Sequence, residues 1–343
     1  MAKFIPLSKG RHAIVDDELF DRIVDNGPWS FDGRYASKSR RRMPKLYMHK
    51  LVCELASKTG DGEIDHVDRN KLNNQRDNLV LTTRSSNMHN RSATKKSLTG
   101  VKGVTWDKHR QQWIAQIKCN GVLKNLGRFS VLEDAITSRL QTEVEQLGHP
   151  VLRAVFLDID DTLNSLTMPA LNHVGCNVSS YPNPGSYDIV GIANSLLPEP
   201  LTVGQFWDRC DREFWVSLPK SVECEMITRF AGSVVGLENT CILTAPTLDP
   251  ECASAKVEWI YRNLPENLHR QYLIGPRKFF CAHHQHLLID DSDTNVRLFR
   301  KHGGHAILVP RPWNSLHGRD TNKHLTEQFS LYCGNNSCNL LAS

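Results

Sequence analysis

The stretch from Ile64 to Arg91 gathers side chains that bind hard cations and phosphate groups. Asp65 and His66 are adjacent, so on a strand they point in different directions, one to hold a cation and the other to polarise a water molecule. Asn78 and Asn87 follow, and amide carbonyls can bind magnesium or brace the loop that carries the histidine. Hydrolysis of a phosphodiester needs a metal on the phosphate, a base for the water and cations for the backbone. The stretch therefore predicts a metal-dependent nuclease.

This pattern resembles the HNH endonucleases, and more closely the phage homing endonucleases whose motif ends in Asn. The resemblance implies that Asp65 and Asn87 hold one Mg²⁺ or Mn²⁺, that His66 is the general base and that Asn78 is a structural brace. His89, two residues beyond Asn87, is the other candidate for the closing position of the motif. The fold that this resemblance implies is a ββα-metal core.

A second group of chemically useful residues follows short apolar runs further along the chain. Residues 151–157 read as a buried parallel strand, and Asp158 and Asp160 come directly after it. Later short strands end at, or run out into, segments that carry Thr244, Lys278, Asp290 and Asp291. Because the carboxyl ends of parallel strands meet at one edge of an open sheet, we expect these side chains to share a crevice. Closely spaced carboxylates need a cation or a shared proton, so magnesium is the natural partner.

In their order along the chain these residues resemble the motifs of the haloacid dehalogenase (HAD) superfamily of phosphohydrolases. The resemblance implies that Asp158 is the nucleophile, that Asp160 donates and later accepts a proton, and that Thr244 and Lys278 bind phosphoryl oxygens. It also implies a magnesium site made by Asp158, Asp160, Asp290 and Asp291. Within the superfamily the chain is most similar to the 5′(3′)-deoxyribonucleotidases, so the expected substrate is a deoxynucleoside monophosphate or another phosphomonoester.

Lys256 is an alternative to Lys278 as the phosphate-binding lysine, since both lie between Thr244 and the last acids. Lys278 is preferred because it follows the end of a strand, where a side chain can reach the crevice. Lys256, in contrast, opens a helix predicted at residues 256–263.

Residues 99–147 have the pattern of a small sheet followed by a helix. Strands are expected at 101–106, 112–119 and 122–129, and a helix at 131–147. Asn120-Gly121 is a dipeptide favoured in tight hairpin turns, so it should join the second and third strands. The face of the second strand that carries Trp113, Ala115 and Ile117 should pack on the helix, which leaves the more polar face free for DNA.

This module resembles the Apetala/ethylene-response-factor (ERF) DNA-binding domain, which inserts a three-stranded sheet into the major groove. The resemblance implies double-stranded DNA as a partner, with contacts from Lys102, Trp106, Arg110, Gln116, Lys118 and Arg128. A second basic group lies in residues 37–45. Its Arg40, Arg41 and Arg42 are interpreted either as part of a solvated loop or as an arm that contacts phosphates.

The charge of the chain differs between its two parts. Residues 1–147 hold 26 Lys and Arg against 17 Asp and Glu, a net charge of +9, whereas the remainder has a net charge of −4. The first part is therefore expected to bind a polyanion. No apolar run approaches the length of a membrane span, and the N-terminus lacks the apolar core of a signal peptide, so we expect no membrane partner. A cytoplasmic location follows, in an infected bacterial host if the protein comes from a phage.

Zinc is not expected. Cys281, His283, His284 and His286 are close in sequence, but they run directly into a predicted strand, and no matching pair follows at finger spacing.

The 343 residues are too many for one ordinary core and suggest two or three domains. We predict a multidomain α+β and α/β chain with a β-rich lead-in (1–50), an HNH core (51–93), the three-stranded DNA-binding module (99–147), a Rossmann-like HAD domain (151–318) and a tail (319–343). A small, mostly helical cap is expected at about 164–236, and the aromatic residues of its segment 205–218 are interpreted as core. Two alternative functions stay open: a catalytically silent DNA-binding tether in the first part, and a phosphatase that trims 3′-phosphates from DNA ends in the second.

Overall fold

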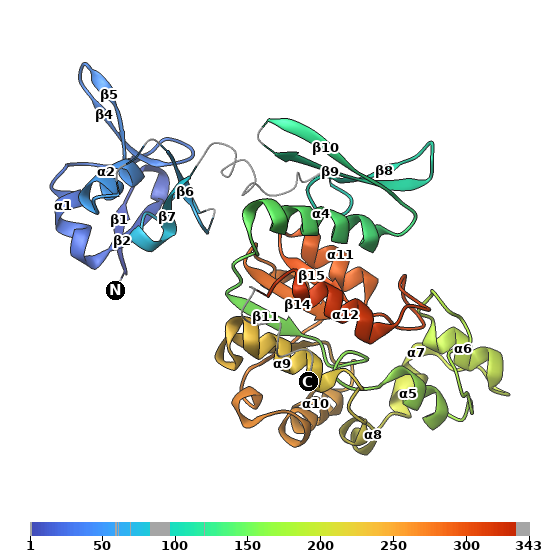
Figure 1. Cartoon of the computed structure of the whole chain (residues 1–343). Helices are drawn as coiled ribbons and strands as arrows, with labels where there is room; N and C mark the ends of the chain where they lie inside the picture. Colours follow the sequence, from blue (N-terminus) through green and yellow to red (C-terminus); the bar gives the residue numbers. More distant parts are fainter. Residues whose placement is uncertain are drawn as a thin grey trace. The chain divides into compact units, whose positions relative to one another are not determined.

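The computed structural model describes residues 2–58, 60, 62–68, 70–82, 97–119 and 121–333. The chain divides into two compact units, residues 1–92 with 119–122, and residues 93–118 with 123–343. Figure 1 labels their helices and strands along the sequence. Each unit is described by itself.

The described residues of the first unit form three small antiparallel sheets and two helices. The sheets are β1–β2, β3–β4–β5 and β6–β7. Their strands are β1 (Ala2–Pro6), β2 (His12–Asp16), β3 (Ser30–Phe31), β4 (Ala36–Arg40), β5 (Met43–Tyr47), β6 (Glu63–His66) and β7 (Leu79–Thr82). The helices are α1 (Phe20–Val24) and α2 (Met48–Leu55), with short 3-10 turns at Ser8–Gly10, Asp17–Leu19 and Arg76–Asn78. All five strands from β1 to β5 lie in the segment predicted to be a β-rich lead-in.

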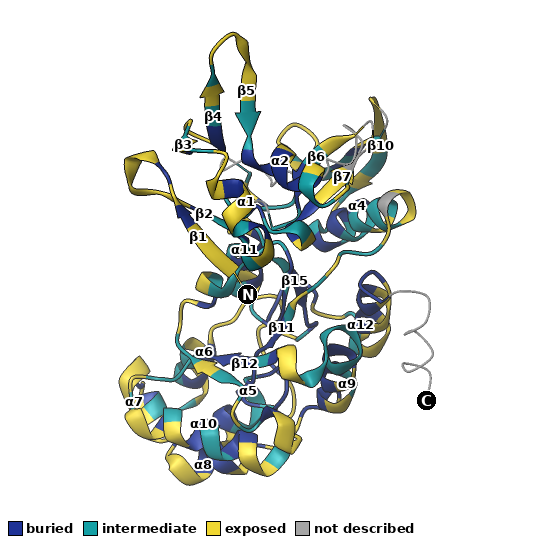
Figure 2. Ribbon diagram, turned by 90° about the vertical axis from the view of Figure 1, so that its left-hand side faces the viewer, coloured by how far each residue is buried: buried dark blue, intermediate teal, exposed yellow. Residues whose placement is uncertain are grey.

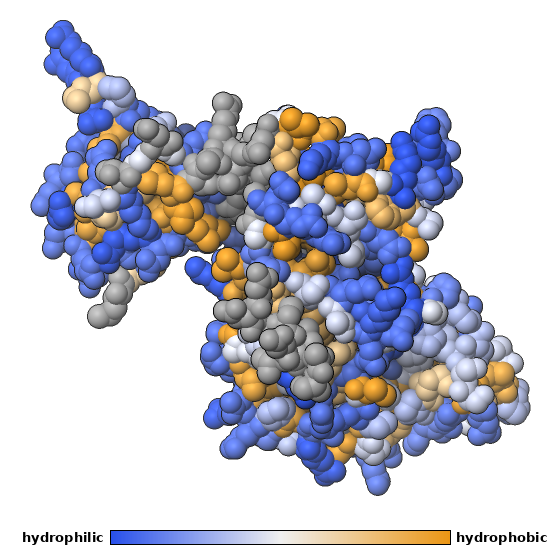
Figure 3. Space-filling view, in the orientation of Figure 1, coloured by the Kyte–Doolittle hydropathy of each residue, from blue (hydrophilic) through white to orange (hydrophobic). Residues whose placement is uncertain are grey.

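One apolar core joins the lead-in of this unit to the nuclease segment. Val15 from β2, Ile23 from α1, Val52 from α2 and Leu79 from β7 are fully buried in the same cluster. The charged run at 37–45 lies mostly in the β4–β5 hairpin, so the loop expected there is a pair of strands. Its tip projects from the unit and is covered by hydrophilic residues (Figure 3).

The second unit begins with the three-stranded module. Strands β8 (Val104–Asp107), β9 (Gln112–Cys119) and β10 (Val122–Phe129) form a sheet in the order β10-β9-β8, followed by helix α4 (Leu132–Leu147). The bounds predicted for the second and third strands are confirmed, and the first strand starts later than expected. Ala115 on β9 packs with Ala135 and Ile136 of α4 in a small buried cluster. The helix therefore covers one face of the sheet, as the sequence pattern predicts.

The opposite side of α4 packs on the rest of the second unit. Both carboxylate oxygens of Glu133 accept hydrogen bonds from the Arg300 guanidinium, at 2.7 and 2.8 Å, and both side chains are buried. Gln328 donates to the hydroxyl of Thr137 at 2.8 Å. Leu140 contacts both the small cluster under the sheet and the large core beyond it. Helix α4 thus contributes to two cores at once, and Figure 2 shows buried and intermediate residues along its turns.

A five-stranded parallel sheet forms the centre of the second unit. Its strands are β11 (Ala154–Leu157), β12 (Thr240–Thr244), β13 (Tyr272–Ile274), β14 (His286–Asp290) and β15 (His305–Leu308), in the order β13-β12-β11-β14-β15. Every neighbouring pair in the sheet is parallel. The helices packed around it are α9 (Cys224–Val235), α10 (Pro250–Asn263), α11 (Asp293–Lys301) and α12 (Thr321–Ser330). This mixed α/β architecture agrees with the predicted doubly wound pattern.

Helices α5 (Thr167–His173), α6 (Ile189–Leu196), α7 (Val203–Asp208) and α8 (Arg212–Ser217) lie in the segment predicted to be a cap, whereas α9, at the end of that segment, contacts β11 and β12 of the sheet. Segment 205–218 is two short helices rather than one, because Asp211 accepts a hydrogen bond from the Phe214 amide and starts α8 anew. Phe206 and Phe214 are buried as expected.

Two helices depart from the sequence analysis. Helix α10 begins at Pro250 and not at Lys256, because Asp249 caps its first turn and proline suits the first helical position. Helix α12 lies in a segment for which no element was predicted, and its Leu325 and Phe329 are fully buried in the main core. Among the described residues, no helix has the length and apolar character needed to cross a membrane.

Candidate active sites

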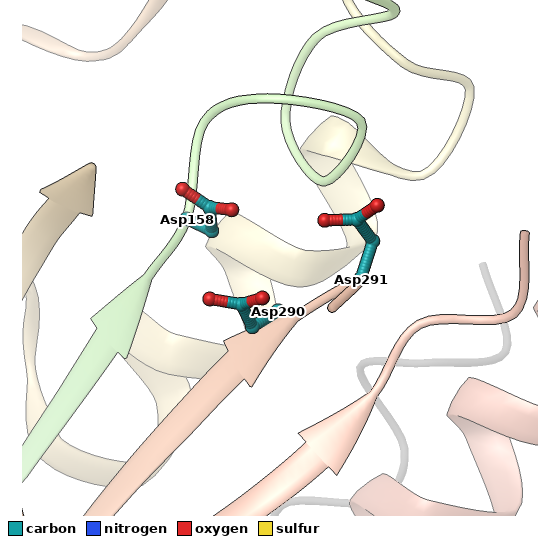
Figure 4. A group of neighbouring side chains, drawn as sticks. All are labelled: Asp158, Asp290 and Asp291. Atoms are coloured by element: carbon teal, nitrogen blue, oxygen red, sulfur yellow. The ribbon is translucent and has the colours of Figure 1, made fainter. Parts of the chain in front are cut away.

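The acids of the second unit meet at the carboxyl edge of the parallel sheet. Asp158 follows the central strand β11, and Asp290 ends the neighbouring strand β14, with Asp291 next to it. One carboxylate oxygen from each of the three lies within 4.8 Å of the others, and all three residues are buried. Figure 4 shows the three carboxylates facing a common space. Topology alone brings them together, since parallel neighbours end at the same edge.

Two buried lysines reach this edge from different elements. Lys278 Nζ lies 2.6 Å from Asp158 Oδ1 and 2.7 Å from Asp290 Oδ2. Lys256 Nζ pairs with the Asp160 carboxylate and donates to Thr244 Oγ1 at 3.2 Å and to the Ala245 carbonyl at 2.7 Å. The prediction that Lys256 opens a helix and does not reach the site is therefore wrong. Lys256 lies inside helix α10, and its side chain reaches the site.

Asp160 does not join the group of three carboxylates, although the sequence analysis expected it there as a metal ligand. Its carboxylate faces Lys256 and the side-chain amide of Asn164 instead. The backbone turns sharply after it, because Asp161 has a left-handed φ of 54°. Asp160 lines the cavity above the site, so its carboxyl group is placed to exchange a proton with a bound molecule.

The electrostatics of this edge favour a bound divalent cation. Burial raises the pKa of Asp158, and the nearby carboxylates of Asp290 and Asp160 add to the shift while Lys278 opposes it. Burial also raises the pKa of Asp291 well above its ordinary value. Buried carboxylates this close repel one another in their ionised forms, and a hard cation with oxygen ligands relieves that cost. The donor set of Asp158, Asp290 and Asp291 fits magnesium.

A cavity of about 1020 Å³ opens above these residues. Asp160, Lys256 and Asp291 are among its lining residues, whereas Asp158 is not and has 7% of its side chain exposed. The remaining walls come largely from the cap and from loops after the strands. They include four large aromatic side chains: Tyr187, Trp207, Trp215 and Trp313. Trp215, whose segment was interpreted as core, is buried and also borders the cavity.

In the first unit, Asp65 and His66 end strand β6, which pairs with β7. Both residues are buried. Asp65 Oδ1 lies 3.0 Å from Lys71 Nζ, and His66 Nε2 lies 3.4 Å from Asn74 Oδ1. Burial lowers the pKa of His66 to about 4, and the positive charge of Lys71 contributes to the shift. The imidazole is therefore neutral near pH 7, the form that a general base requires.

Asn78 braces the loop that follows His66. Its side-chain Oδ1 accepts a hydrogen bond from the Asp68 amide at 2.9 Å. Its Nδ2 donates to Asp68 Oδ1 at 2.8 Å and to the Asn73 carbonyl at 2.7 Å. These contacts suit the structural role implied for it. Asn87 and His89 lie outside the described residues, as does the segment that would carry the helix of a ββα arrangement.

His49, at the start of α2, is a residue that the sequence analysis missed. Its ring centroid lies 5.4 Å from that of His66, and Tyr47 stacks on it at 5.5 Å. The side chain is buried, and its Nδ1 has no hydrogen-bond partner among the described residues. The sequence around His49 does not predict a place in the site, because only the fold brings this histidine next to His66.

The free face of the three-stranded sheet carries only part of the expected DNA contacts. Lys102, Arg110 and Lys118 are exposed, and Gln116 is half-buried. Arg128 is ion-paired with Asp107 at 2.7 Å. Trp106 is a correction: it pairs across the strands with Trp113, and cross-strand partners share a face, so it lies on the side of the sheet that α4 covers.

At the tip of the β4–β5 hairpin, Arg41 and Arg42 are exposed. Arg40 is half-buried and donates from Nε to the Pro44 carbonyl at 3.2 Å. Arg42 has a left-handed φ of 60°, which turns the chain between the two strands. The tip therefore presents two solvated guanidinium groups.

Comparison with known proteins agrees with the interpretation of the first unit. Residues 46–89 match the HNH endonuclease family. Protein 3.8 of Escherichia phage T7 is 36% identical over 70 residues, which are 20% of this chain and 58% of the phage protein. The chain thus matches little more than half the length of that relative.

Several solved structures resemble parts of the chain at low identity. A haloacid dehalogenase-like family hydrolase from Xanthomonas campestris is 12% identical with a TM-score of 0.32, covering 50% of this chain and 87% of that one. A HAD family hydrolase from Deinococcus radiodurans R1, with bound phosphate and sodium, is 15% identical with a TM-score of 0.33, covering 57% and 90%. A HAD family enzyme from Bacteroides thetaiotaomicron, in complex with magnesium and inorganic phosphate, is 10% identical with a TM-score of 0.26, covering 49% and 96%. The chemistry of the second unit follows instead from its own sheet order and side chains.

Proposed function

We propose that the chain joins a metal-dependent DNA endonuclease of the homing type to a magnesium-dependent phosphomonoesterase that acts on deoxynucleoside monophosphates. The observation that carries the second activity is the convergence of Asp158, Thr244, Lys278 and the Asp290–Asp291 pair at one sheet edge. The first activity is supported by the family match over residues 46–89 together with the buried Asp65–His66 pair. We further propose that the ERF-like sheet directs the nuclease to its sequence.

In the phosphatase, Asp158 attacks phosphorus and forms an aspartyl phosphate as the ester oxygen leaves. Asp160 gives that oxygen a proton, and later takes one from the water that hydrolyses the aspartyl phosphate. Lys278, between Asp158 and Asp290, places a positive charge beside two buried carboxylates and an anionic substrate. Thr244 Oγ1 and the two lysines can bind phosphoryl oxygens. When bound, the divalent cation supplies neutralising charge at both active sites.

In the nuclease, the neutral His66 takes a proton from the water that attacks the phosphodiester. Asp65 and Asn87 are the proposed metal ligands. Lys71 neutralises Asp65 at 3.0 Å, so binding a cation there requires that this ion pair open.

Two features of the cavity support a nucleotide as the phosphatase substrate. Its volume of about 1020 Å³ exceeds what a phosphate group alone would need. Its aromatic walls offer flat surfaces on which a base can stack. The free face of the three-stranded sheet is on the opposite side of the second unit from α7 and α8, in both Figure 1 and Figure 2. DNA held on that face would thus be far from the cavity, which favours a free nucleotide over a DNA end.

A substrate panel tests the phosphatase. Deoxynucleoside monophosphates, ribonucleoside monophosphates and a 3′-phosphorylated oligonucleotide are compared in magnesium, with Asp158→Asn as the control that keeps shape and removes the nucleophile. The deoxynucleotides should be hydrolysed fastest. Turnover of the oligonucleotide alone would support end trimming, and activity that survives in Asp158→Asn would refute the mechanism.

Plasmid nicking in magnesium or manganese tests the nuclease. Wild type should cut, and His66→Ala should bind the plasmid without cutting it. If neither cuts while both bind, the first part is a DNA-binding tether.

A further inference from the structure

The loop after β15 donates hydrogen bonds to Asp291, one of the three clustered acids. The indole Nε1 of Trp313 donates a hydrogen bond to Asp291 Oδ2 at 2.7 Å. The neighbouring Asn314 donates from Nδ2 to the Asp291 carbonyl at 2.8 Å and to the Val309 carbonyl at 2.7 Å. Both Trp313 and Asn314 are buried. The loop therefore fixes Asp291 by its side chain and by its backbone.

Two tyrosines of the cap contact the indole ring of Trp313. The ring of Tyr181 meets Trp313 edge to face at 5.3 Å, and Tyr187 meets it at 6.3 Å. Tyr181 is itself fixed, because its hydroxyl donates to the Ser186 carbonyl at 2.9 Å and accepts from the Asp188 amide at 3.0 Å. Trp313 thus has little freedom to rotate away from Asp291.

A carboxylate beside two others has several orientations of similar energy unless a donor selects one. A hydrogen bond that occupies one oxygen directs the second oxygen elsewhere, and outer contacts of this kind commonly set the affinity of a metal site. Lys278 contacts both Asp158 and Asp290, and Asn295 donates a further hydrogen bond to Asp290. Both carboxylates therefore already have fixed partners. Trp313 supplies the comparable partner for Asp291.

We propose that Trp313 is a positioning residue, which holds Oδ2 of Asp291 so that the other carboxylate oxygen faces the cation, and which thereby sets the affinity of this site for divalent metal. The inference rests on the proposed magnesium site. It also makes the cap part of the metal site, because the tyrosines that hold the indole belong to the cap.

Binding of Mn²⁺ to the full chain, followed by the electron paramagnetic resonance of free Mn²⁺, tests this without reference to turnover. Asp65→Asn serves as the parent, since it removes a proposed ligand from the nuclease site and leaves one class of site to titrate. In that parent, Trp313→Phe keeps an aromatic ring and loses the N–H donor. Its dissociation constant for Mn²⁺ should rise by about 10-fold to 100-fold.

A matched control is available in Trp259, which is also buried and also donates its Nε1 at 2.7 Å, but to the Leu218 carbonyl. Trp259→Phe should leave Mn²⁺ affinity unchanged even where it lowers the melting temperature. A double-mutant cycle with Asp291→Asn adds a second readout. If Trp313 acts through Asp291, Trp313→Phe should weaken binding no further in the Asp291→Asn background.

The outcomes are separable. A parent that does not bind Mn²⁺ at all refutes the proposed metal site, and with it the basis of the inference. A parent that binds, with equal affinity in Trp313→Phe, refutes the role of Trp313 alone. Should Trp313→Phe fail to fold, Tyr187→Ala carries the test, because its side chain is half exposed and backs the indole. It should weaken Mn²⁺ binding in the same direction by a smaller factor, and an unchanged affinity would count against the proposal.

Discussion

The proposed nuclease site and the proposed phosphatase site both offer oxygen ligands to a cation, but different structures hold those ligands. Among the described residues of the first unit, one buried acid, Asp65, lies on a two-stranded hairpin. Side-chain amides of Asn73, Asn74 and Asn78 hold the adjoining loop. In the second unit three acids end neighbouring strands of a five-stranded sheet with a large core beneath it.

The difference shows two ways to fix a polar site. A parallel sheet sets the positions of its strand ends through backbone hydrogen bonds and apolar burial, so its acids need few further contacts. A short hairpin has a small core, and its loop must be fixed by side chains that bond to the backbone. In the first unit, the asparagine-rich sequence between residues 70 and 78 supplies such side chains.

The largest effects are expected from two substitutions that should each reduce one activity strongly and leave the other unchanged. Asp158→Asn should reduce phosphatase turnover by about 10³-fold or more and leave plasmid nicking at the wild-type rate. His66→Ala should do the reverse, with a loss of nicking of about 10² to 10⁴-fold. Both activities are measured on each full-length variant. A loss of both activities in either variant would mean that the sites depend on one another.

The next effect concerns the two ion pairs between α4 and the parallel-sheet core. Arg300→Met leaves the buried Glu133 carboxylate without its bidentate partner and should cost roughly 3–5 kcal/mol of unfolding free energy. Arg319→Met breaks a pair with Asp134 in which both side chains are about one-third exposed, and should cost about 0–1 kcal/mol. Urea denaturation of the full chain measures both. Equal costs would show that the buried pair does not hold the module in place.

A smaller effect is expected when the asparagine side chains that support the two proposed metal sites, Asn78 and Asn295, are replaced. Asn78→Ala removes three hydrogen bonds from the loop after His66 and should raise the metal concentration needed for nicking by about 10-fold to 100-fold. Asn295→Ala removes the amide contacts to Asp290, but Lys278 and the Ser292 amide still hold that carboxylate. Its effect on the metal requirement of the phosphatase should be smaller. The opposite order would overturn the distinction between hairpin and sheet.

The smallest effect is expected at the hairpin tip. Replacing Arg41 and Arg42 together by alanine should weaken DNA binding about equally for all sequences. It should also lower the slope of log affinity against log salt by about 1 for each phosphate that an arginine no longer neutralises. Filter binding across a salt series measures the slope. An unchanged slope would assign these two arginines to solvent, which is the other interpretation of the charged segment.

Sequence reasoning was most successful where periodicity and strand ends decide the outcome. The bounds of β9 and β10 were predicted because alternation and an Asn-Gly turn are local signals, and Asp158 and Asp290 follow from topology once the strands are recognised. It was wrong about Lys256, because the Asp249-Pro250 signal for a helix start was overlooked.

The residues that sequence reasoning missed depend on contacts between distant segments. His49 near the start of α2 and His66 at the end of β6 are 17 residues apart in the sequence, and Trp313 meets Asp291 only through the loop after β15. Trp106 was placed on the wrong face because its register with Trp113 is a property of the paired strands, not of either strand alone.

Helix α4 determines which parts of this chain can be exchanged between proteins. It contributes Ala135 and Ile136 to the core under the three-stranded sheet, and Glu133 and Leu140 to the core of the parallel sheet. A recombination event that transferred the sheet and this helix to a new host would carry a buried carboxylate with no guanidinium to receive it. The three-stranded sheet is therefore tied to the parallel-sheet core, whereas the described residues of the first unit have a core of their own.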